Sequence, residues 1–192
     1  MDIISPPIAA TVIETPRLIL RPLTVADGPD VRRLAGTYEV ASTTLSVPHP
    51  YPEGAAEAWI ATHPDSLARG EFVAFGIAWR ETTELVGAIG LTLALSQCRA
   101  EMGYWLGHEY WGRGIATEAA TAILKYGFET LGLHRIYATH FRRNPASGRV
   151  MQKIGMRHEG TLRGWVLKWG EFEDCELYAK LRDDDRLDLD TR

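Results

Sequence analysis

Residues 101–120 read EMGYWLGHEYWGRGIATEAA, and the character of this stretch changes half-way along it. The part up to Leu106 is rich in apolar and aromatic residues, which is typical of a β-strand, whereas the part from Ile115 is rich in helix-forming Ala and Glu. The two parts are joined by one cation, Arg113, and three glycines, Gly107, Gly112 and Gly114. We therefore predict a strand, a glycine-containing turn and a helix, in this order.

The turn at residues 112–114 has the composition of an anion-binding turn. Glycine lets the backbone adopt positive φ angles and lets a ligand approach the chain closely. The first N–H groups of a helix have no partner inside it and lie at the positive end of the helix dipole, so they stabilise a phosphate group. A tight corner that binds nothing would need the same glycines, and that alternative stays open at this point.

Three kinds of phosphate site compete for this turn. A P-loop needs Gly-Lys-Ser/Thr at the helix start, and residues 113–115, which read RGI, do not supply it. A dinucleotide site needs a small residue where Thr117 stands and usually an acid after the next strand. Residues 141–143 read FRR, so only a phosphorylated dinucleotide would fit. The third candidate is the pyrophosphate of coenzyme A.

Hydrophobic periodicity and turn residues predict the elements on both sides of this stretch. Strands are expected at residues 17–23, 72–80, 84–95, 100–107, 134–141 and on both sides of a turn at 169–170 within 157–181, and helices at 27–38, from about 52, at 114–132 and at 144–155. One helix separates the strands that contain Glu101 and His134, so we expect these two to be parallel and the rest antiparallel. This order predicts an α/β fold with a single mixed, mostly antiparallel sheet of about seven strands, a central parallel pair and helices on both faces.

Length and composition limit the classes of protein that fit. The chain has 192 residues, 45% of them hydrophobic, and a formal net charge of −4. These values predict one domain over residues 1–192, with a core at about 13–181 and short flexible ends. The acidic balance argues against a nucleic-acid partner, and no apolar run approaches the roughly 20 residues of a membrane span. Two cysteines and six scattered histidines lack metal-ligand spacing, so we expect reduced thiols, no metal and a cytoplasmic protein.

Four segments in order resemble one family. Residues 103–119, GYWLGHEYWGRGIATEA, are similar to the acyl-CoA loop of the GNAT superfamily of N-acetyltransferases, nearest to the RimJ/RimL-like branch that acetylates ribosomal-protein N-termini. Gly114 and Ala116 match the end of the signature Gln/Arg-x-x-Gly-x-Gly/Ala, whereas Trp111 stands at its Gln/Arg position. The other three segments are ETPRLILRPL (14–23), NPASGRVMQKIGMRHEG (144–160) and LRGWVLKWGEFEDCELYAKL (162–181).

The resemblance implies a GNAT fold and an enzyme that uses acetyl-CoA as its acyl donor. It implies that the strand at Glu101 diverges from the strand at His134 and that the pantetheine arm lies in the gap. Backbone N–H groups near Trp105 and Leu106 would then polarise the thioester carbonyl. The pyrophosphate would be held by Gly112, Arg113, Gly114, Ile115, Ala116 and Thr117.

The segment at residues 144–155 is implied to complete the donor site. Asn144 is either a helix N-cap or a hydrogen-bond partner of the pantetheine, or both. Ser147 is either the proton donor to the departing thiolate or a serine on the helix surface. Arg149 and Lys153, with Arg142 and Arg143, form a local basic patch that would meet the 3′-phosphate, although a solvated helix face would look the same.

The general base is the least determined assignment. Some relatives place a glutamate six or seven residues after the EG that matches Glu159-Gly160, and here that position reads Trp165-Val166. Glu101 is the remaining candidate, either as the base or in an ion pair with Arg99. A weak base favours an α-amine, with a pKa of about 7.7–8.0, over a lysine at about 10.4.

Two classes of function follow. The first is an N-acetyltransferase that acts on the α-amine of a protein or peptide N-terminus, or alternatively on a small amine such as a polyamine, an amino acid or an antibiotic. The second is a non-catalytic acyl-CoA-binding regulatory domain. The acceptor pocket is expected from the first two helices and the last two strands, with the side chains of His49, Tyr51, Trp165, Lys168 and Trp169 as candidate lining. The chain is expected to be a monomer or a homodimer.

Overall fold

The computed structural model describes residues 11–184, so most of the flexible ends predicted outside about 13–181, namely residues 1–10 and 185–192, lies outside this range. Within it the chain forms an eight-stranded sheet in the order β1-β2-β3-β4-β5-β6-β8-β7. The strands are β1 (Ile13–Glu14), β2 (Leu18–Arg21), β3 (Phe72–Trp79), β4 (Leu85–Ala94), β5 (Arg99–Leu106), β6 (Arg135–Phe141), β7 (Arg157–Lys168) and β8 (Glu171–Leu181). Of these neighbours only β5 and β6 are parallel, so the predicted mixed sheet is confirmed. The strand beyond the expected seven is β1, whose two residues are too few to show periodicity.

The α-helices of the described residues are α1 (Gly28–Ala35), α2 (Tyr38–Thr43), α3 (Ala55–Ala61), α4 (His63–Ala68), α5 (Ile115–Lys125) and α6 (Pro145–Lys153). The sequence predicts two helices before β3, whereas the structure has four. Thr37 starts α2 directly after α1, because its hydroxyl accepts a hydrogen bond from the N–H of Val40 at 3.5 Å. Pro64 lies in the first turn of α4 and lacks an N–H group, so α3 cannot continue through it.

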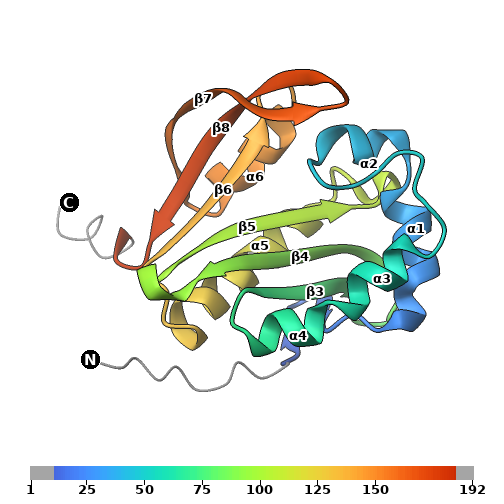
Figure 1. Cartoon of the computed structure of the whole chain (residues 1–192). Coiled ribbons are helices and arrows are strands. Elements are labelled where there is room, and N and C mark those ends of the chain that lie inside the picture. The colour runs from blue at the N-terminus through green and yellow to red at the C-terminus, as the bar shows by residue number, and fades with distance from the viewer. Residues whose placement is uncertain (1–10, 185–192) are drawn as a thin grey trace.

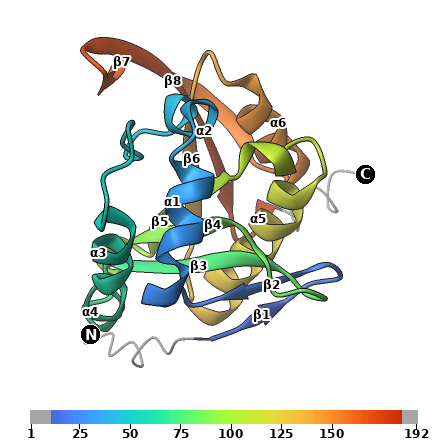
Figure 2. The same cartoon turned by 90° about the vertical axis from the view of Figure 1, so that its right-hand side faces the viewer.

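The helices cover both faces of the sheet, as predicted. α3 and α4 lie on one side and α5 and α6 on the other (Figures 1 and 2). The helix predicted at residues 114–132 is α5 followed by a π turn, Tyr126–Thr130, and Gly132 then ends it with a φ of 70°. None of the helices at residues 11–184 is long and apolar enough to cross a membrane.

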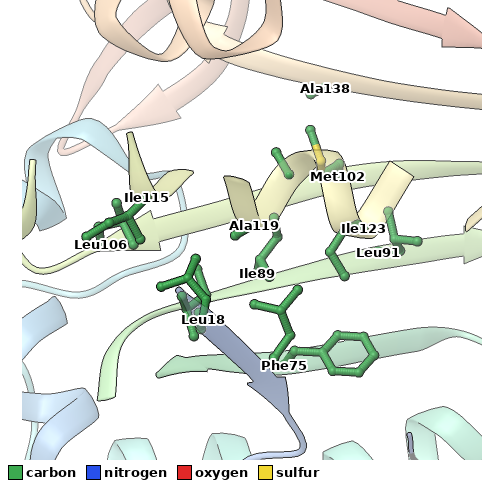
Figure 3. Packing of buried hydrophobic residues seen from close by; sticks show 14 of the residues in the cluster. Leu18, Phe75, Ile89, Leu91, Met102, Leu106, Ile115, Ala119, Ile123 and Ala138 are labelled. Carbon is green, nitrogen blue, oxygen red and sulfur yellow. The ribbon is translucent and has the colours of Figure 1, made fainter. Parts of the chain in front are cut away.

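The packing of α5 positions the glycine turn. Ile115, Ala119 and Ile123 recur every four residues, so they lie on one face of the helix. Each is at most 1% exposed, and they point toward a buried apolar surface of the sheet (Figure 3). That surface includes Leu18, Phe75, Ile89, Leu91 and Met102. Burial of this face holds the N-terminus of α5 at the carboxyl end of β5.

The parallel pair diverges, as the resemblance implies. Residues 99–101 of β5 pair with residues 135–137 of β6, and the pairing ends at Glu101↔Tyr137. β5 continues to pair with β4 as far as Leu106. Figure 1 shows β5 and β6 separating beyond this point. One edge of β5 is therefore left without a strand neighbour over residues 102–106.

The polar segment predicted to fray at residues 182–192 begins with anchored residues. The guanidinium of Arg182 donates to the carbonyl oxygens of Leu133 and Phe128, at 2.9 and 2.8 Å. Asp184 is 6% exposed and accepts a hydrogen bond from the N–H of Leu181 at 2.8 Å. Residues 182–184 therefore belong to the packed structure. Their polar composition did not indicate this, because their hydrogen-bond partners include residues as distant in sequence as Leu133 and Phe128.

Histidine 63 is buried without a hydrogen-bond partner in the described residues, and we expect it to make the stability of the fold sensitive to acid. His63 is 9% exposed, and its ring packs edge-on against that of Trp59 with 4.5 Å between the ring centroids. Neither ring nitrogen has a hydrogen-bond partner within residues 11–184. Burial lowers the pKa of His63, so the unfolded chain binds a proton more readily than the folded chain. Stability should fall as the pH drops through the unfolded value of about 6.5, until the lowered folded value is reached.

His63→Phe is expected to stabilise the protein by about 1 kcal/mol at neutral pH, because two buried polar atoms without partners are removed. Its urea midpoint should also change less than that of the wild type between about pH 7 and pH 5. Exposed His134→Phe serves as the matched control and should keep the wild-type pH dependence. Equal pH dependence in His63→Phe and the wild type would contradict the assignment.

Candidate active site

The glycine turn has the geometry of an anion cradle. Gly112 and Gly114 adopt φ angles of 74° and 76°, which disfavour any residue with a side chain. A Cβ atom built on Gly112 has no heavy atom within 4 Å, so the space in front of the turn is open. Gly114 is the N-cap of α5 and supplies no side-chain cap, so the first N–H groups of the helix remain available to a ligand.

The first β-hairpin braces this turn from behind. Arg17 donates through Nη1 to the carbonyl oxygen of Arg113 at 3.1 Å and through Nε to Glu118 at 2.7 Å. Glu118 also accepts from the hydroxyl of Thr15 at 2.6 Å. Burial alone would raise the pKa of Glu118, but the bonds from Thr15 and Arg17 hold it below its usual value. Sequence reasoning missed this brace, although its residues lie in two of the segments that carry the family resemblance.

Tryptophan 111 explains the departure from the family signature. Its indole Nε1 donates to the carbonyl oxygen of Leu106 at 3.0 Å, and its ring packs edge-on against His108 at 4.8 Å between centroids. The side chain therefore fastens the start of the glycine turn to the last residue of β5. Trp111 therefore has a structural role at the position where the family signature has Gln or Arg.

The unpaired edge of β5 presents backbone groups to the gap. The N–H of Gly107 donates to the carbonyl of Val86 on β4, so by the alternation of an antiparallel ladder Trp105 also faces β4. The N–H groups of Tyr104 and Leu106 consequently face the side where β6 has diverged. Of the two residues expected to polarise a thioester, Leu106 offers its N–H to the gap, and Tyr104 is a second donor that sequence reasoning missed.

Ser147 lies in the first turn of α6, across the gap from β5. Its Oγ is 2.7 Å from the hydroxyl oxygen of Tyr104, so this contact joins the two sides of the opening. Burial raises the pKa of Tyr104 to about 12, and the bond to Ser147 opposes part of that rise. The tyrosine therefore keeps its proton at neutral pH. The expectation that Ser147 faces the gap rather than bulk solvent agrees with this contact.

Asn144 does not cap α6 through its side chain, which corrects one of its two predicted roles. Its ψ of 67° departs from the extended geometry of a side-chain N-cap. The N–H of Ser147, which such a cap would bond, donates instead to the backbone carbonyl of Asn144 at 3.2 Å. Within the described residues the Asn144 side chain makes no capping hydrogen bond, so its amide is available to a ligand.

The basic patch divides into paired and unpaired cations. Arg142 lies 3.7 Å from a carboxylate oxygen of Asp174, and Arg143 lies 2.7 Å from one of Glu173. Arg149 and Lys153 are exposed on α6, and neither forms an ion pair inside residues 11–184. Of these four cations, Arg149 and Lys153 are therefore the two without an ion-pair partner in the described residues, which suits them to bind an added phosphate.

Glu101 lies at the point where the parallel strands part. Its carboxylate accepts long hydrogen bonds from the hydroxyls of Tyr137 and Thr139, at 3.5 and 3.4 Å. No ion pair with Arg99 forms in the described part of the chain, so that alternative is not observed. Burial, followed by the nearby Glu101 charge, raises the pKa of Tyr137. Glu101 is thus held weakly by two neutral hydroxyls, and strand alternation places it on the face opposite Tyr104.

The thiol of Cys175 lies near this carboxylate and is inert. Cys175 is 2% exposed and forms no disulfide. Burial, together with surrounding carboxylates that include Glu173 and Glu101, raises its pKa to about 11. It therefore stays protonated at neutral pH and does not compete as a nucleophile.

A loop over residues 44–54 is fastened to the β7–β8 hairpin by Lys168. This lysine is 6% exposed, and its Nζ donates to the carbonyl oxygens of Leu45 and Val47, each at 3.1 Å. Tyr38 stacks on Trp169 at 5.7 Å between centroids, which adds an aromatic contact beside the lysine. These contacts form one wall of the region above the Glu101 face of the sheet.

Trp165, another candidate for the acceptor lining, makes none of these contacts. It is 61% exposed. Val166 and Lys168 share one face of the hairpin through their pairing with Glu173 and Glu171, whereas Trp165 lies in the irregular part of β7 between Leu162 and Val166, where the pairing with β8 shifts register.

Lys168→Met is expected to lower the free energy of unfolding by about 2 kcal/mol, because two hydrogen bonds from a buried cation are lost. It should also raise KM for the acceptor more than KM for the donor, since the freed loop borders the acceptor side. Thermal unfolding and steady-state kinetics measure both effects. Lys125→Met, at an exposed position 3.9 Å from Glu129, is the control and should change neither quantity appreciably.

A family model described as an acetyltransferase (GNAT) domain matches residues 17–157. The chain belongs to the GNAT acetyltransferase family. The resemblance stated from the sequence is thereby confirmed, and acetyl-CoA is the acyl donor that enzymes of this family use. The open turn at residues 112–114 and the free backbone edge of β5 are features of this GNAT enzyme that suit such a donor.

Known relatives agree with this family. The GNAT enzyme is 34% identical over 178 residues, 88% of its chain and 95% of the other, to the uncharacterized N-acetyltransferase YoaA of Bacillus subtilis (strain 168). It is 28% identical over 133 residues, 68% of each chain, to the ribosomal protein uS5-alanine N-acetyltransferase of Escherichia coli (strain K12). Mycobacterium smegmatis RimJ in complex with CoA-disulfide has the same fold, with a TM-score of 0.80, 24% identity and coverage of 97% of this chain and 96% of that one. These findings support the RimJ/RimL-like branch.

Proposed function

We propose that this GNAT enzyme transfers an acetyl group from acetyl-CoA to the α-amine of a peptide or protein N-terminus. The observation that carries the proposal is the unpaired edge of β5 beyond Glu101. It has a carboxylate on one face of the sheet and the hydroxyl of Ser147 on the other. A thioester lying along this edge would therefore meet a proton acceptor and a proton donor on opposite sides.

The donor would lie along β5 as if it were an added strand. The N–H groups of Tyr104 and Leu106 face this position, and the amide of Asn144 is free to bond the pantetheine arm. The turn at residues 112–117 would hold the pyrophosphate at the N-terminus of α5. The remaining phosphate would meet Arg149 and Lys153, the exposed cations of α6.

The chemistry assigned to the protein is proton transfer and charge stabilisation. Glu101 takes a proton from the acceptor amine, directly or through a water, as the new C–N bond forms. The N–H groups of Tyr104 and Leu106 stabilise the charge that develops on the thioester oxygen. When the C–S bond breaks, the hydroxyl of Ser147 donates a hydrogen bond to the departing thiolate and keeps its proton, and the thiolate takes its proton from water.

The weak environment of Glu101 favours an α-amine as acceptor. An α-amine with a pKa of about 7.7–8.0 is partly free base at neutral pH, whereas a lysine side chain at about 10.4 needs a stronger base. The E. coli relative is named for an N-terminal alanine of a ribosomal protein, which supports the same class of acceptor. A small amine is the second candidate, because Tyr38 and Trp169 form an exposed aromatic surface beside the acceptor side.

A thiol-release assay with acetyl-CoA tests the proposal. Acceptors are peptides that begin with Ala or Ser, the same peptides with a blocked N-terminus and a free lysine, polyamines and aminoglycosides. We expect turnover with free N-termini and little with the blocked peptides. Turnover of the small amines alone would move the function to the second candidate. Tight acetyl-CoA binding without turnover of any acceptor would indicate a binding domain.

A further inference from the structure

The hydroxyl pair of Tyr104 and Ser147 connects two elements that the fold otherwise separates. Tyr104 lies on β5, Ser147 lies on α6 after β6, and the two strands part at Glu101. The Tyr104 hydroxyl is 2.7 Å from Ser147 Oγ and 3.4 Å from the Ser147 carbonyl oxygen. No other partner of either hydroxyl lies within residues 11–184.

The number of protons in this pair decides which hydroxyl donates. A serine hydroxyl has one proton and can accept further hydrogen bonds through its oxygen. If Ser147 donates its one proton in a hydrogen bond to a thiolate in the gap, it cannot also donate to Tyr104. Tyr104 must then be the donor, and Oγ is its nearer acceptor. The tyrosine retains its own proton at neutral pH because burial disfavours the phenolate.

We propose that Tyr104 is a positioning residue whose hydroxyl donates to Ser147 Oγ and so directs the Ser147 proton into the gap. The proposal rests on the role of Ser147 in the proposed function. Donation to Oγ also polarises the serine hydroxyl and makes it a better donor, since linked hydrogen bonds strengthen one another. Tyr104 therefore acts on the leaving group through Ser147 without touching it.

An introduced thiol tests, without any turnover, whether the Tyr104 hydroxyl donates a hydrogen bond to the position of Oγ. Ser147→Cys in a Cys98→Ser background places a titratable sulfur where Oγ stands, and buried Cys175 stays unreactive below its pKa of about 11. The pH dependence of iodoacetamide labelling then gives the pKa of the introduced thiol. If Tyr104 donates to this position, adding Tyr104→Phe should raise that pKa by about one unit. An unchanged or lowered pKa would overturn the proposal.

Kinetics test the consequence for catalysis. Tyr104→Phe should lower kcat about tenfold with little change in KM for acetyl-CoA, as expected for one hydrogen bond. In a Ser147→Ala background the same change should lower kcat less than about twofold, because its effect passes through the serine. Tyr110→Phe is the matched control, since this buried hydroxyl donates to Glu84 at 2.6 Å and lies outside the gap.

The outcomes separate this inference from the proposed function. Additive losses, or a larger loss in Tyr104→Phe than in Ser147→Ala, would mean that Tyr104 contacts the thiolate itself, and would overturn the positioning role. A wild-type enzyme without turnover would count against the proposed function, and the labelling experiment would still decide whether Tyr104 donates to the position of Oγ.

Discussion

Glu101→Gln is expected to lower kcat about 100-fold and to leave the affinity for acetyl-CoA within about twofold of the wild type. The amide keeps the size of the carboxylate and its contacts with Tyr137 and Thr139, but it cannot take a proton from the acceptor. Steady-state kinetics with a peptide acceptor and calorimetric titration with acetyl-CoA measure the two quantities. The loss should shrink as the pH rises past the α-amine value of about 8, because the amine then loses its proton without help.

Glu173→Gln is the matched control for this experiment. Glu173 pairs with Val166 across the hairpin, and the two side chains lie on the same face. Position 166 is one of the two where the family resemblance would place a glutamate. Arg143 holds its carboxylate at 2.7 Å, so we expect kcat to change less than about threefold. A large loss of kcat in Glu173→Gln with none in Glu101→Gln would show that Glu173, and not Glu101, is the general base.

Gly114→Val is expected to weaken acetyl-CoA binding about 100-fold, comparable to the loss of two charge-assisted hydrogen bonds. The new side chain would stand where a phosphate must approach the N–H groups of α5. It would also strain the backbone, because φ at this position is 76°. Isothermal titration with acetyl-CoA measures the affinity, and thermal unfolding measures the strain.

Gly54→Val separates the two effects. Gly54 is the N-cap of α3 with a φ of 73°, and a Cβ atom there has no heavy atom within 4 Å. It therefore imposes nearly the same backbone strain at a helix start far from the glycine turn. Similar stability losses in both variants, with weak binding only in Gly114→Val, would support the cradle. Equal affinities would show that the phosphate site lies elsewhere.

The elements nearest the site were the most predictable from sequence because their signals are local. Apolar and aromatic residues marked β5, helix-forming Ala and Glu marked α5, and the glycines marked the turn between them. The division of the region before β3 into four helices was not predicted, since α2 and α4 have six residues each and show less than two turns of periodicity. Position along the chain also suggested a side-chain cap at Asn144, which the local backbone angle prevents.

The contacts that refine the site could not be predicted because they join distant residues. Arg17 and Glu118 lie 101 positions apart, and Tyr104 and Ser147 lie 43 apart. Neither pair produces a periodic signal, and each depends on how β5 and its neighbours are arranged in space. Trp111 was noted only as a departure from a signature, and its bond to Leu106 became visible in the fold.

The brace formed by Thr15, Arg17 and Glu118 links two equilibria: ligand binding at the glycine turn and docking of the β1–β2 hairpin against it. A ligand that binds the proposed cradle also selects the conformation in which the hairpin of β1 and β2 is docked. By reciprocity, docking of the hairpin would strengthen ligand binding by the same free energy with which the bound ligand stabilises the docked hairpin, although no hairpin residue needs to touch the ligand. We therefore expect donor affinity to depend partly on a segment that lies outside the proposed cradle.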